Sequence, residues 1–219
     1  AVINYQNTTI GKYIEFSIGI ACTHGTAPAP AVLPAALMNL FGTGQYVVDL
    51  PVSSELSVKG DKGIWGMPKH QANLDFKLDA QSASSAYELD GMPAVRLDID
   101  LPTSPAIPVR SAAVNYCAFR GMLMKSTIYM NGSARISLMN KGSARLTIGT
   151  HPRVQVLKDL DISPDPLMTA FVAEATGTLD DHIEAWFLDY ETVPAAAPEG
   201  LESVVNLGRS EEWLAPPRR

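Results

Sequence analysis

The chain has little of what would mark it as a nucleic-acid-binding or disulfide-rich protein. Its 219 residues carry a net charge of −6 and include only two cysteines, Cys22 and Cys117. An acidic chain lacks the basic face that non-specific nucleic-acid binding requires. Two distant cysteines with apolar neighbours define no disulfide framework, although one bridge between them stays open. We therefore expect no nucleic-acid partner, and free thiols in a reducing, cytoplasmic setting.

Long apolar runs are also missing. The longest apolar stretch, residues 27–41, is interrupted by Pro28, Pro30 and Pro34, and it is too short to span a membrane. The chain opens on Ala1 without an initiator methionine or a basic segment that leads into an apolar one. We therefore expect no membrane partner and no signal peptide. The opening residues read like the inside of a strand, so we expect the natural chain to begin earlier.

Several common catalytic motifs do not occur. The sequence contains no Gly-x-Ser-x-Gly elbow, no phosphate-binding glycine loop and no His-Glu-x-x-His. His24 follows Cys22 by two positions, but no second pair at a recognised metal-ligand spacing accompanies it. We therefore predict neither a metal nor an organic cofactor.

The residues that are present favour one mostly β domain over residues 1–219. Hydrophobic residues make up 46% of the chain and charged residues 18%, which allows a sizeable core. Apolar and polar residues alternate with period two in several segments, as is typical of half-buried strands. These segments are residues 13–20, 74–78 and 95–101, with a short apolar run at 45–50.

Turn signals indicate that the strands are antiparallel. Asp90-Gly91 and Asn131-Gly132 are pairs that take up the type I′ turn of a β-hairpin. Asn131-Gly132 and a further turn at 140–142 predict a meander through residues 122–148. A continuous sheet of this kind has to protect its edges, so we predict that it closes into a barrel.

Helix signals are few. Residues 34–40 and 166–175 are candidates for short helices, whereas residues 183–190 favour a strand. The tail 194–219 is rich in Ala, Pro and Glu, and we expect it to wrap the surface of the domain.

The most unusual segment is Gly60–His70, which reads Gly-Asp-Lys-Gly-Ile-Trp-Gly-Met-Pro-Lys-His. It places Lys69 after Trp65, Met67 and a proline that stiffens the backbone. Burial of a lysine among apolar side chains disfavours its charged form and lowers its pKa. A neutral amine can add to a ketone and form an imine, which draws electrons from an adjacent carbon–carbon bond without a cofactor. A structural turn with an exposed lysine is the plain alternative.

This segment resembles the lysine motif of the acetoacetate decarboxylase family and its wider superfamily, many of whose members carry Trp-Gly-x-Pro-Lys. The residues Tyr13-Ile14-Glu15-Phe16 resemble the family's Tyr-x-Glu strand. The likeness is loose and runs from near residue 2 to about residue 190. It implies a cone-like, mostly antiparallel β barrel, a homo-oligomer and a Schiff base on Lys69.

The resemblance implies catalytic roles for Lys69 and Glu15. Glu15 would transfer protons or hold the substrate. The neighbouring residues of the two motifs are candidates for substrate binding: Tyr13, Trp65, Met67 and His70. The partner would be a small keto acid, and the reaction would release CO2 from an acetoacetate-like compound.

The chain departs from the family at three places. Asp61-Lys62-Gly63 stands where the family has Gly-Arg-Glu, His70 replaces the second lysine of Pro-Lys-Lys, and the family's N-terminal portion has no counterpart. Lys62 reads as a surface charge. Acetoacetate decarboxylase is an established case of a lysine activated by desolvation or by a cationic neighbour, and here desolvation would have to contribute more. Two alternatives stay open: an aldolase-dehydratase that joins pyruvate to an aldehyde, and a binding protein without catalysis.

Overall fold

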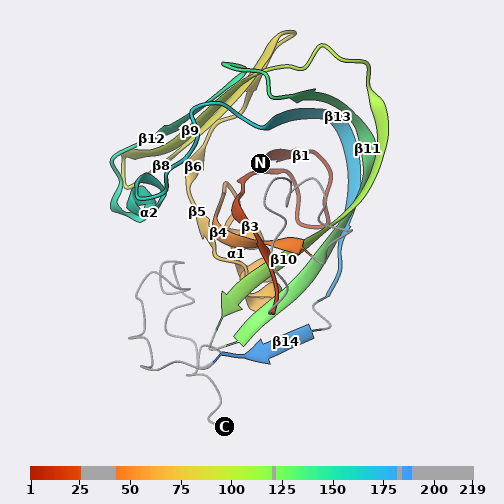
Figure 1. The fold of residues 1–219 in the computed structure, drawn as a ribbon. Helices are drawn as coiled ribbons and strands as arrows, with labels where there is room; N and C mark the ends of the chain where they lie inside the picture. Colours follow the sequence, from red (N-terminus) through yellow and green to blue (C-terminus); the bar gives the residue numbers. More distant parts are fainter. Residues whose placement is uncertain (26–42, 120–121, 182–183, 189–219) are drawn as a thin grey trace.

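The computed structural model describes residues 1–25, 43–119, 122–181 and 184–188, and their strands form two sheets (Figure 1). The larger sheet contains β1 Val2–Tyr5, β2 Tyr13–Phe16, β3 Ile18–Thr23, β4 Thr43–Val52, β5 Lys69–Gln71, β10 Ile107–Phe119, β11 Met122–Leu138, β13 Met168–Leu179 and β14 Glu184–Phe187. The smaller sheet contains β6 Asn73–Leu74, β7 Lys77–Leu78, β8 Ser82–Leu89, β9 Met92–Asp100 and β12 Ala144–Ile148.

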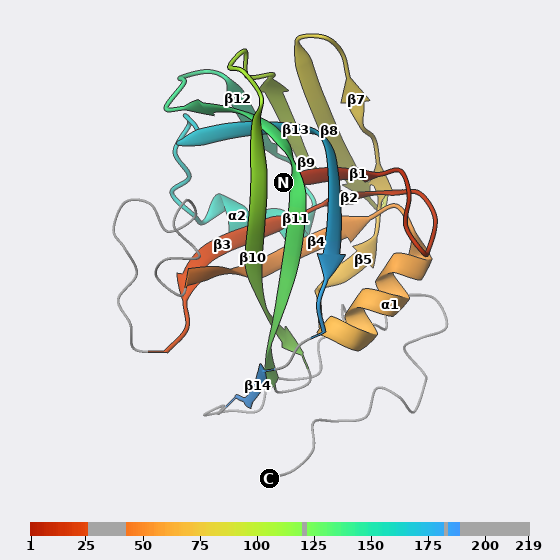
Figure 2. The ribbon, with the colours of Figure 1, turned by 90° about the vertical axis from the view of Figure 1, so that its right-hand side faces the viewer.

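The larger sheet is built around a central strand, β4. Its order is β1-β2-β4-β10-β11-β13, while β3 and β5 also pair with β4 and β14 pairs with β11. The long strands β10, β11 and β13 cross in front of the N-terminal strands in Figure 2, so the sheet is strongly curved. The smaller sheet follows the order β12-β9-β8-β6, with β7 beside β8.

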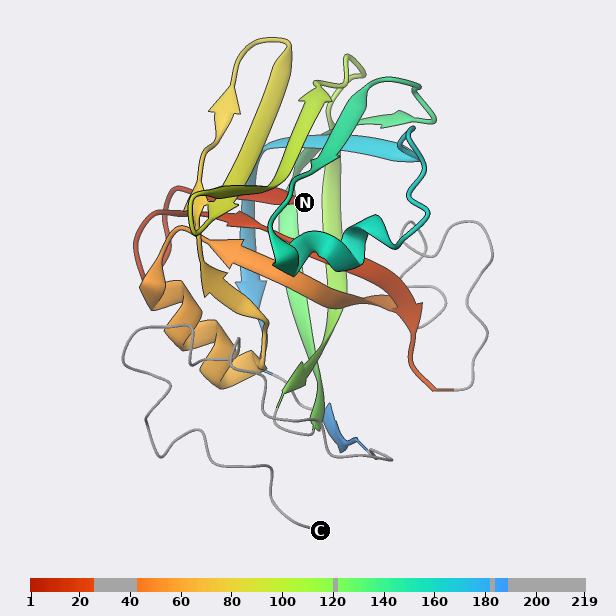
Figure 3. The same ribbon diagram turned by 90° about the vertical axis from the view of Figure 1, so that its left-hand side faces the viewer.

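A hydrophobic cluster joins the two sheets. Phe16 of β2 meets Tyr87 of β8 edge to face, with ring centroids 5.4 Å apart. Val95 of β9 lies in the same cluster, and so does Leu157 of the short helix α2, Gln155–Lys158. Figure 3 shows α2 over this part of the molecule, after the 3₁₀ turn at Pro152–Val154. The cluster holds β2 close to the second sheet.

The prediction of a mostly β protein is confirmed, but closure into a cone-like barrel remains a prediction. Within the described ranges, neither sheet closes on itself. Among these same residues, no helix is both long and apolar enough to cross a membrane. Both cysteines are free thiols, as expected.

One of the two hairpin predictions is confirmed and the other is wrong. Asp90 and Gly91 have φ angles of 51° and 73° and join β8 to β9, as the type I′ turn requires. Asn131 and Gly132 instead lie inside the continuous strand β11. Asn131 pairs with Arg110 on one side and Thr176 on the other. The pairing register shifts after Gly132, so this glycine serves a bulge in a central strand and not a turn.

Three further predictions concern the second half of the chain. Residues 166–175 are not a helix, because β13 pairs along β11 over Met168–Leu179 and its backbone groups are used in the sheet. The predicted meander is also wrong at its end, since β12 pairs with β9 and not with β11. The strand predicted at 183–190 is confirmed over its described part, where β14 covers Glu184–Phe187. The predicted helix at 34–40 and the tail 194–219 lie outside the described residues.

Candidate active site

A helix that the sequence analysis did not predict carries half of the candidate site. Helix α1, Glu55–Trp65, begins at Ser54, whose hydroxyl accepts from the backbone N–H of Ser57 at 3.4 Å. It ends at Gly66, which has a φ of 64°. A side chain at Gly66 would also meet the Cβ of Phe119 at 2.6 Å. After Pro68 the chain enters β5, whose first residue is Lys69. This strand lies beside α1, the helix that precedes it (Figure 2).

Side chains from β2, β5 and α1 meet at the amine of Lys69. Strand β5 lies parallel to β4 with Lys69 opposite Leu50, and β2 reaches β4 where Glu15 pairs with Val52. The Lys69 Nζ donates to the Glu15 Oε2 at 2.6 Å and to the Ser57 Oγ at 3.0 Å. It also forms an ion pair with the Asp61 carboxylate. Ser57 and Asp61 are four residues apart on α1, so they project from one face of the helix.

The amine is enclosed. The Lys69 side chain is 1% exposed, that of Glu15 9% and that of Asp61 17%. The ring centroid of Tyr13 lies 5.4 Å from the Lys69 Nζ, and the ring of Tyr5 stacks on that of Tyr13 at 4.4 Å. The site therefore combines one buried cation, two carboxylates and an aromatic wall.

The electrostatics differ from the expectation of a neutral lysine. Burial opposes the charged form of Lys69, but the nearby carboxylates of Glu15 and Asp61 outweigh it, and the pKa of Lys69 is raised above its ordinary value of 10.5. The resting lysine is therefore an ammonium ion. It becomes a nucleophile only after it gives up a proton, and the two carboxylates are placed to accept that proton.

Removing one of these carboxylate charges should lower the pKa of Lys69. We expect Glu15→Gln to favour the neutral amine, because one of the two anions that stabilise the ammonium ion is lost. Trace acetylation of the folded protein over a pH series, read at Lys69 by peptide mass spectrometry, would then begin at lower pH than in the wild type. Lys59, an exposed lysine on α1 that pairs with Glu55, provides the internal control. An unchanged Lys69 profile would contradict the electrostatic assignment.

His70 belongs to a separate buried cluster on the other face of β5. Successive residues of a strand point to opposite sides, and the His70 Nε2 lies 2.8 Å from the Asp49 Oδ1. The Tyr87 hydroxyl donates to the Asp49 Oδ2 at 2.9 Å, and the Arg153 Nε donates to Oδ1 at 3.1 Å. Burial opposes the Asp49 charge, yet these partners, His70 foremost, lower the pKa of Asp49 below its ordinary 3.8. Burial and Asp49 raise the pKa of Tyr87.

The other predicted binding residues lie around the lysine segment. Met67 packs in a cluster with Val47, Leu50 and Cys117. The Trp65 indole N–H donates to the Asp180 carbonyl at 2.7 Å. Their contacts in the structure are thus with the protein core and the end of β13, and their role in substrate binding stays a prediction.

Lys62 corrects an expectation. It was read as a surface charge, but only 5% of its surface is exposed. It lies in the last turn of α1, on a buried side of the helix.

Comparison with known proteins bears on the fold. No family model and no curated protein sequence matches the chain. Among solved structures, acetoacetate decarboxylase from Legionella pneumophila superposes with a TM-score of 0.57 at 12% identity, over 83% of this chain and 70% of that chain. The chain has the acetoacetate decarboxylase fold. A second acetoacetate decarboxylase structure gives a TM-score of 0.55 at 12% identity, over 85% of this chain and 73% of its own.

Within this acetoacetate decarboxylase fold, the sequence analysis found Lys69 and Glu15 but missed Ser57 and Asp61. Gly60 and Gly63 reduce the helix propensity of the segment, so its helical spacing was not recognised. A signal was present, because Ser54 followed by Glu55 is a typical helix start. Reading a helix from that start would have put Ser57 and Asp61 on one face, just before the lysine.

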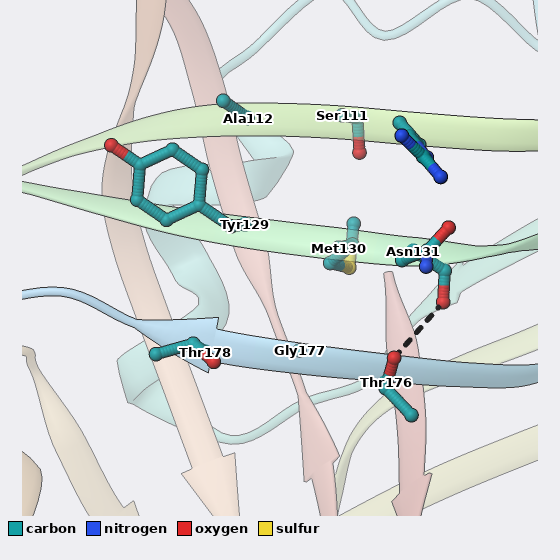
Figure 4. Close-up of a pocket in the computed structure, with 9 residues that line it drawn as sticks. Ser111, Ala112, Tyr129, Met130, Asn131, Thr176, Gly177 and Thr178 are labelled. Carbon is teal, nitrogen blue, oxygen red and sulfur yellow. Dashed lines mark hydrogen bonds between the residues drawn. The ribbon is translucent and has the colours of Figure 1, made fainter.

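The described chain also has a depression away from the group around Lys69. An open depression of about 550 Å³ lies on β10, β11 and β13, lined by residues such as Arg110, Tyr129 and Thr176 (Figure 4). These side chains are exposed, and none belongs to the group around Lys69. The described residues hold no cluster of three or more His, Cys, Asp or Glu that could bind a metal.

Proposed function

We propose that the protein is a cofactor-independent carbon–carbon lyase that binds a small β-keto acid as a Schiff base on Lys69 and releases CO2. The observation that carries the proposal is the buried Lys69 amine, which is held by Glu15, Ser57 and Asp61. The shared fold supports it, since both solved structures are named acetoacetate decarboxylase. Closure into a cone-like barrel and assembly into a homo-oligomer belong to the same proposal.

The first stage is formation of the imine. A carboxylate of the site takes one proton from the ammonium ion, and the free amine of Lys69 adds to the ketone carbon. The resulting carbinolamine loses its hydroxyl as water after a proton returns to it. The product is a protonated imine, which takes the place of the ammonium cation between Glu15 and Asp61. Tyr13, whose ring lies 5.4 Å from the Nζ, is proposed to contact the bound acid.

The second stage is loss of CO2. The electron pair of the bond to the carboxylate moves into the protonated imine, which leaves a neutral enamine on Lys69. A proton is then added to the enamine carbon, and water releases the ketone and restores the lysine.

A second candidate uses the same cation with pyruvate. A carboxylate that lies within hydrogen-bonding distance of Nζ is close enough to remove a methyl proton from a pyruvate imine. The enamine formed in this way would attack an aldehyde, and loss of water would complete an aldolase-dehydratase reaction. The two carboxylates beside the amine are the observation that favours this alternative.

Borohydride trapping separates these possibilities. We expect incubation with acetoacetate followed by borohydride to give a stable adduct on intact protein, because reduction of the imine makes the bond permanent. An adduct with the mass of reduced acetone imine shows that CO2 left before reduction, whereas one that keeps the carboxylate shows binding without decarboxylation. Trapping with pyruvate in the presence of an aldehyde tests for the dehydrated condensation product.

Two variants make the result specific. Lys69→Ala should give no adduct, whereas Lys59→Ala, at an exposed lysine of α1, should give the wild-type amount. If neither acid leaves an adduct on the wild-type protein, the Schiff-base function on these substrates is refuted. Stabilisation by either acid without an adduct would indicate the non-catalytic binding role instead.

A further inference from the structure

The three groups on the Lys69 amine differ in their access to water. The residue Ser57 is fully buried, and the Glu15 side chain is 9% exposed. Asp61 is the most open of the three, with 17% of its side chain exposed. A Cβ placed on the neighbouring Gly60 would meet nothing within 4 Å in the part of the chain that is described, so the helix surface next to Asp61 is open. Asp61 thus touches the buried amine on one side and solvent on the other.

The proposed reaction requires a proton from solvent in each turnover. An anionic β-keto acid and one proton give a neutral ketone and CO2. The proton ends on the carbon that carried the carboxylate. Because the enamine is attached to a buried lysine, this proton has to pass from water through the wall of the site.

We propose that Asp61 is a catalytic residue that takes this proton from water and delivers it to the enamine carbon, while Glu15 remains the fixed counterion of the cation. This inference rests on the proposed function. Asp61 becomes protonated when the anionic substrate binds, which keeps the net charge of the cluster constant. Loss of CO2 converts the cation and the substrate carboxylate into a neutral enamine. Transfer of the Asp61 proton to carbon then restores the cation and both carboxylates.

Glu15 is the poorer candidate for this role. It lies on β2, the strand that also carries Tyr13, and the ring of Tyr5 stacks on the ring of Tyr13. Burial, together with the Glu15 charge, raises the pKa of Tyr5, which disfavours a tyrosinate on this side of the cluster. We therefore assign the role of counterion to Glu15, on the aromatic side of the cluster, and proton exchange to Asp61, on the helix side.

Exchange of acetone protons with heavy water tests the assignment directly. Acetone bound to Lys69 as an imine gives the same enamine when it loses a methyl proton. In heavy water, each return of a proton to this carbon adds one deuterium, which mass spectrometry detects in the acetone. We expect Asp61→Asn to slow this exchange by about 100-fold, the usual contribution of a general acid or base. Borohydride trapping of acetone should persist in the variant, because Lys69 and Glu15 remain.

The controls distinguish a catalytic from a structural role. Asp61→Glu should recover part of the exchange, and Glu55→Gln, on the exposed face of the same helix, should exchange like the wild type. If Asp61→Asn does not fold, Asp61→Ser removes the acid with a smaller side chain and is read in the same way.

Each outcome has one meaning. A variant that lacks the Asp61 acid, is trapped normally and exchanges at the wild-type rate would overturn the role of Asp61 and leave the proposed function intact. A wild-type protein that is trapped by neither acetone nor acetoacetate would overturn the function, and the role of Asp61 with it.

Discussion

Replacing Asp49 by alanine is expected to lower the free energy of unfolding by about 3–5 kcal/mol, as when one member of a buried ionic cluster is removed. Asp49 is 6% exposed and accepts hydrogen bonds from Tyr87 and Arg153 as well as contacting His70. Removal of the carboxylate leaves the Tyr87 hydroxyl and the Arg153 guanidinium without this acceptor. Buried polar groups that lose their partner cost more than the net value of the bond itself.

The loss is large because the cluster connects the two sheets. Asp49 and His70 come from β4 and β5 of the larger sheet, whereas Tyr87 comes from β8 of the smaller one. Urea denaturation at neutral pH, followed by far-UV circular dichroism, measures the effect. Asp98→Ala is the matched control, since Asp98 also pairs with an arginine, Arg96, but on an exposed strand surface. Equal stability of the Asp49 and Asp98 variants would contradict the assignment.

The pH dependence has a defined sign. Because the pKa of Asp49 is lowered in the folded state, its contribution to stability is present above the ordinary value of 3.8 and is lost as the pH falls through the folded value. The difference in the free energy of unfolding between the wild type and Asp49→Ala should therefore become smaller only below pH 3.8. A difference that shrinks already near neutral pH would assign the cluster's stability to a group other than Asp49.

The candidate site could be predicted only where its residues carry local signals. Lys69 follows a stiff Trp-Gly-x-Pro segment, and Glu15 lies on a strand with a recognisable Tyr-x-Glu pattern, so both were found. Asp49 has no such signal. It is one acidic residue in an apolar strand, and only the packing of two sheets brings three partners to it.

Period-two alternation identified strands better than it identified their faces. The alternation over residues 13–20 predicts one continuous strand with a single apolar face, which would include Ile14 and Phe16. The structure divides this segment between β2 and β3, and buries Tyr13 and Glu15 in addition to Phe16. Ile20 is 45% exposed. When both faces of a strand are covered, alternation cannot show which face meets the core, because that depends on partners distant in sequence.

The two Asx-Gly pairs illustrate the same limit. Both have the local chemistry of a type I′ turn, but only Asp90-Gly91 forms one. At Asn131-Gly132 the chain gains pairing on both sides from β10 and β13, and this tertiary gain outweighs the local preference for a turn. Local signals therefore predicted the class of fold, while long-range pairing decided where its strands continue.

Substituting Lys69 by methionine is expected to destabilise the protein, although methionine is apolar and similar in length. The change leaves the carboxylates of Glu15 and Asp61 facing each other without the cation that both of them contact. Removing one partner of a buried ionic group in this way costs about 3–5 kcal/mol. Uptake of a proton by one carboxylate relieves the repulsion, so the loss should become smaller as the pH is lowered.

Neutralising the whole cluster should reverse most of this loss. The triple variant Lys69→Met, Glu15→Gln, Asp61→Asn removes all three charges and keeps the volumes similar, and such replacements of a complete buried ionic group are often close to neutral. Urea denaturation of the single and triple variants at one pH measures the difference. A triple variant as unstable as Lys69→Met would show that the lysine stabilises the fold by packing and not by charge.

The wild-type protein offers an independent check of the same cluster. Since the pKa of Lys69 is raised in the folded state, its ion pairs contribute fully below the ordinary value of 10.5, and this contribution is lost as the pH rises through the higher folded value. The stability difference between the wild type and the triple variant should therefore stay constant from neutral pH up to 10.5 and fall only above it. A fall near neutral pH would mean that the amine already exists in its neutral form there, with the nucleophile ready before any substrate binds.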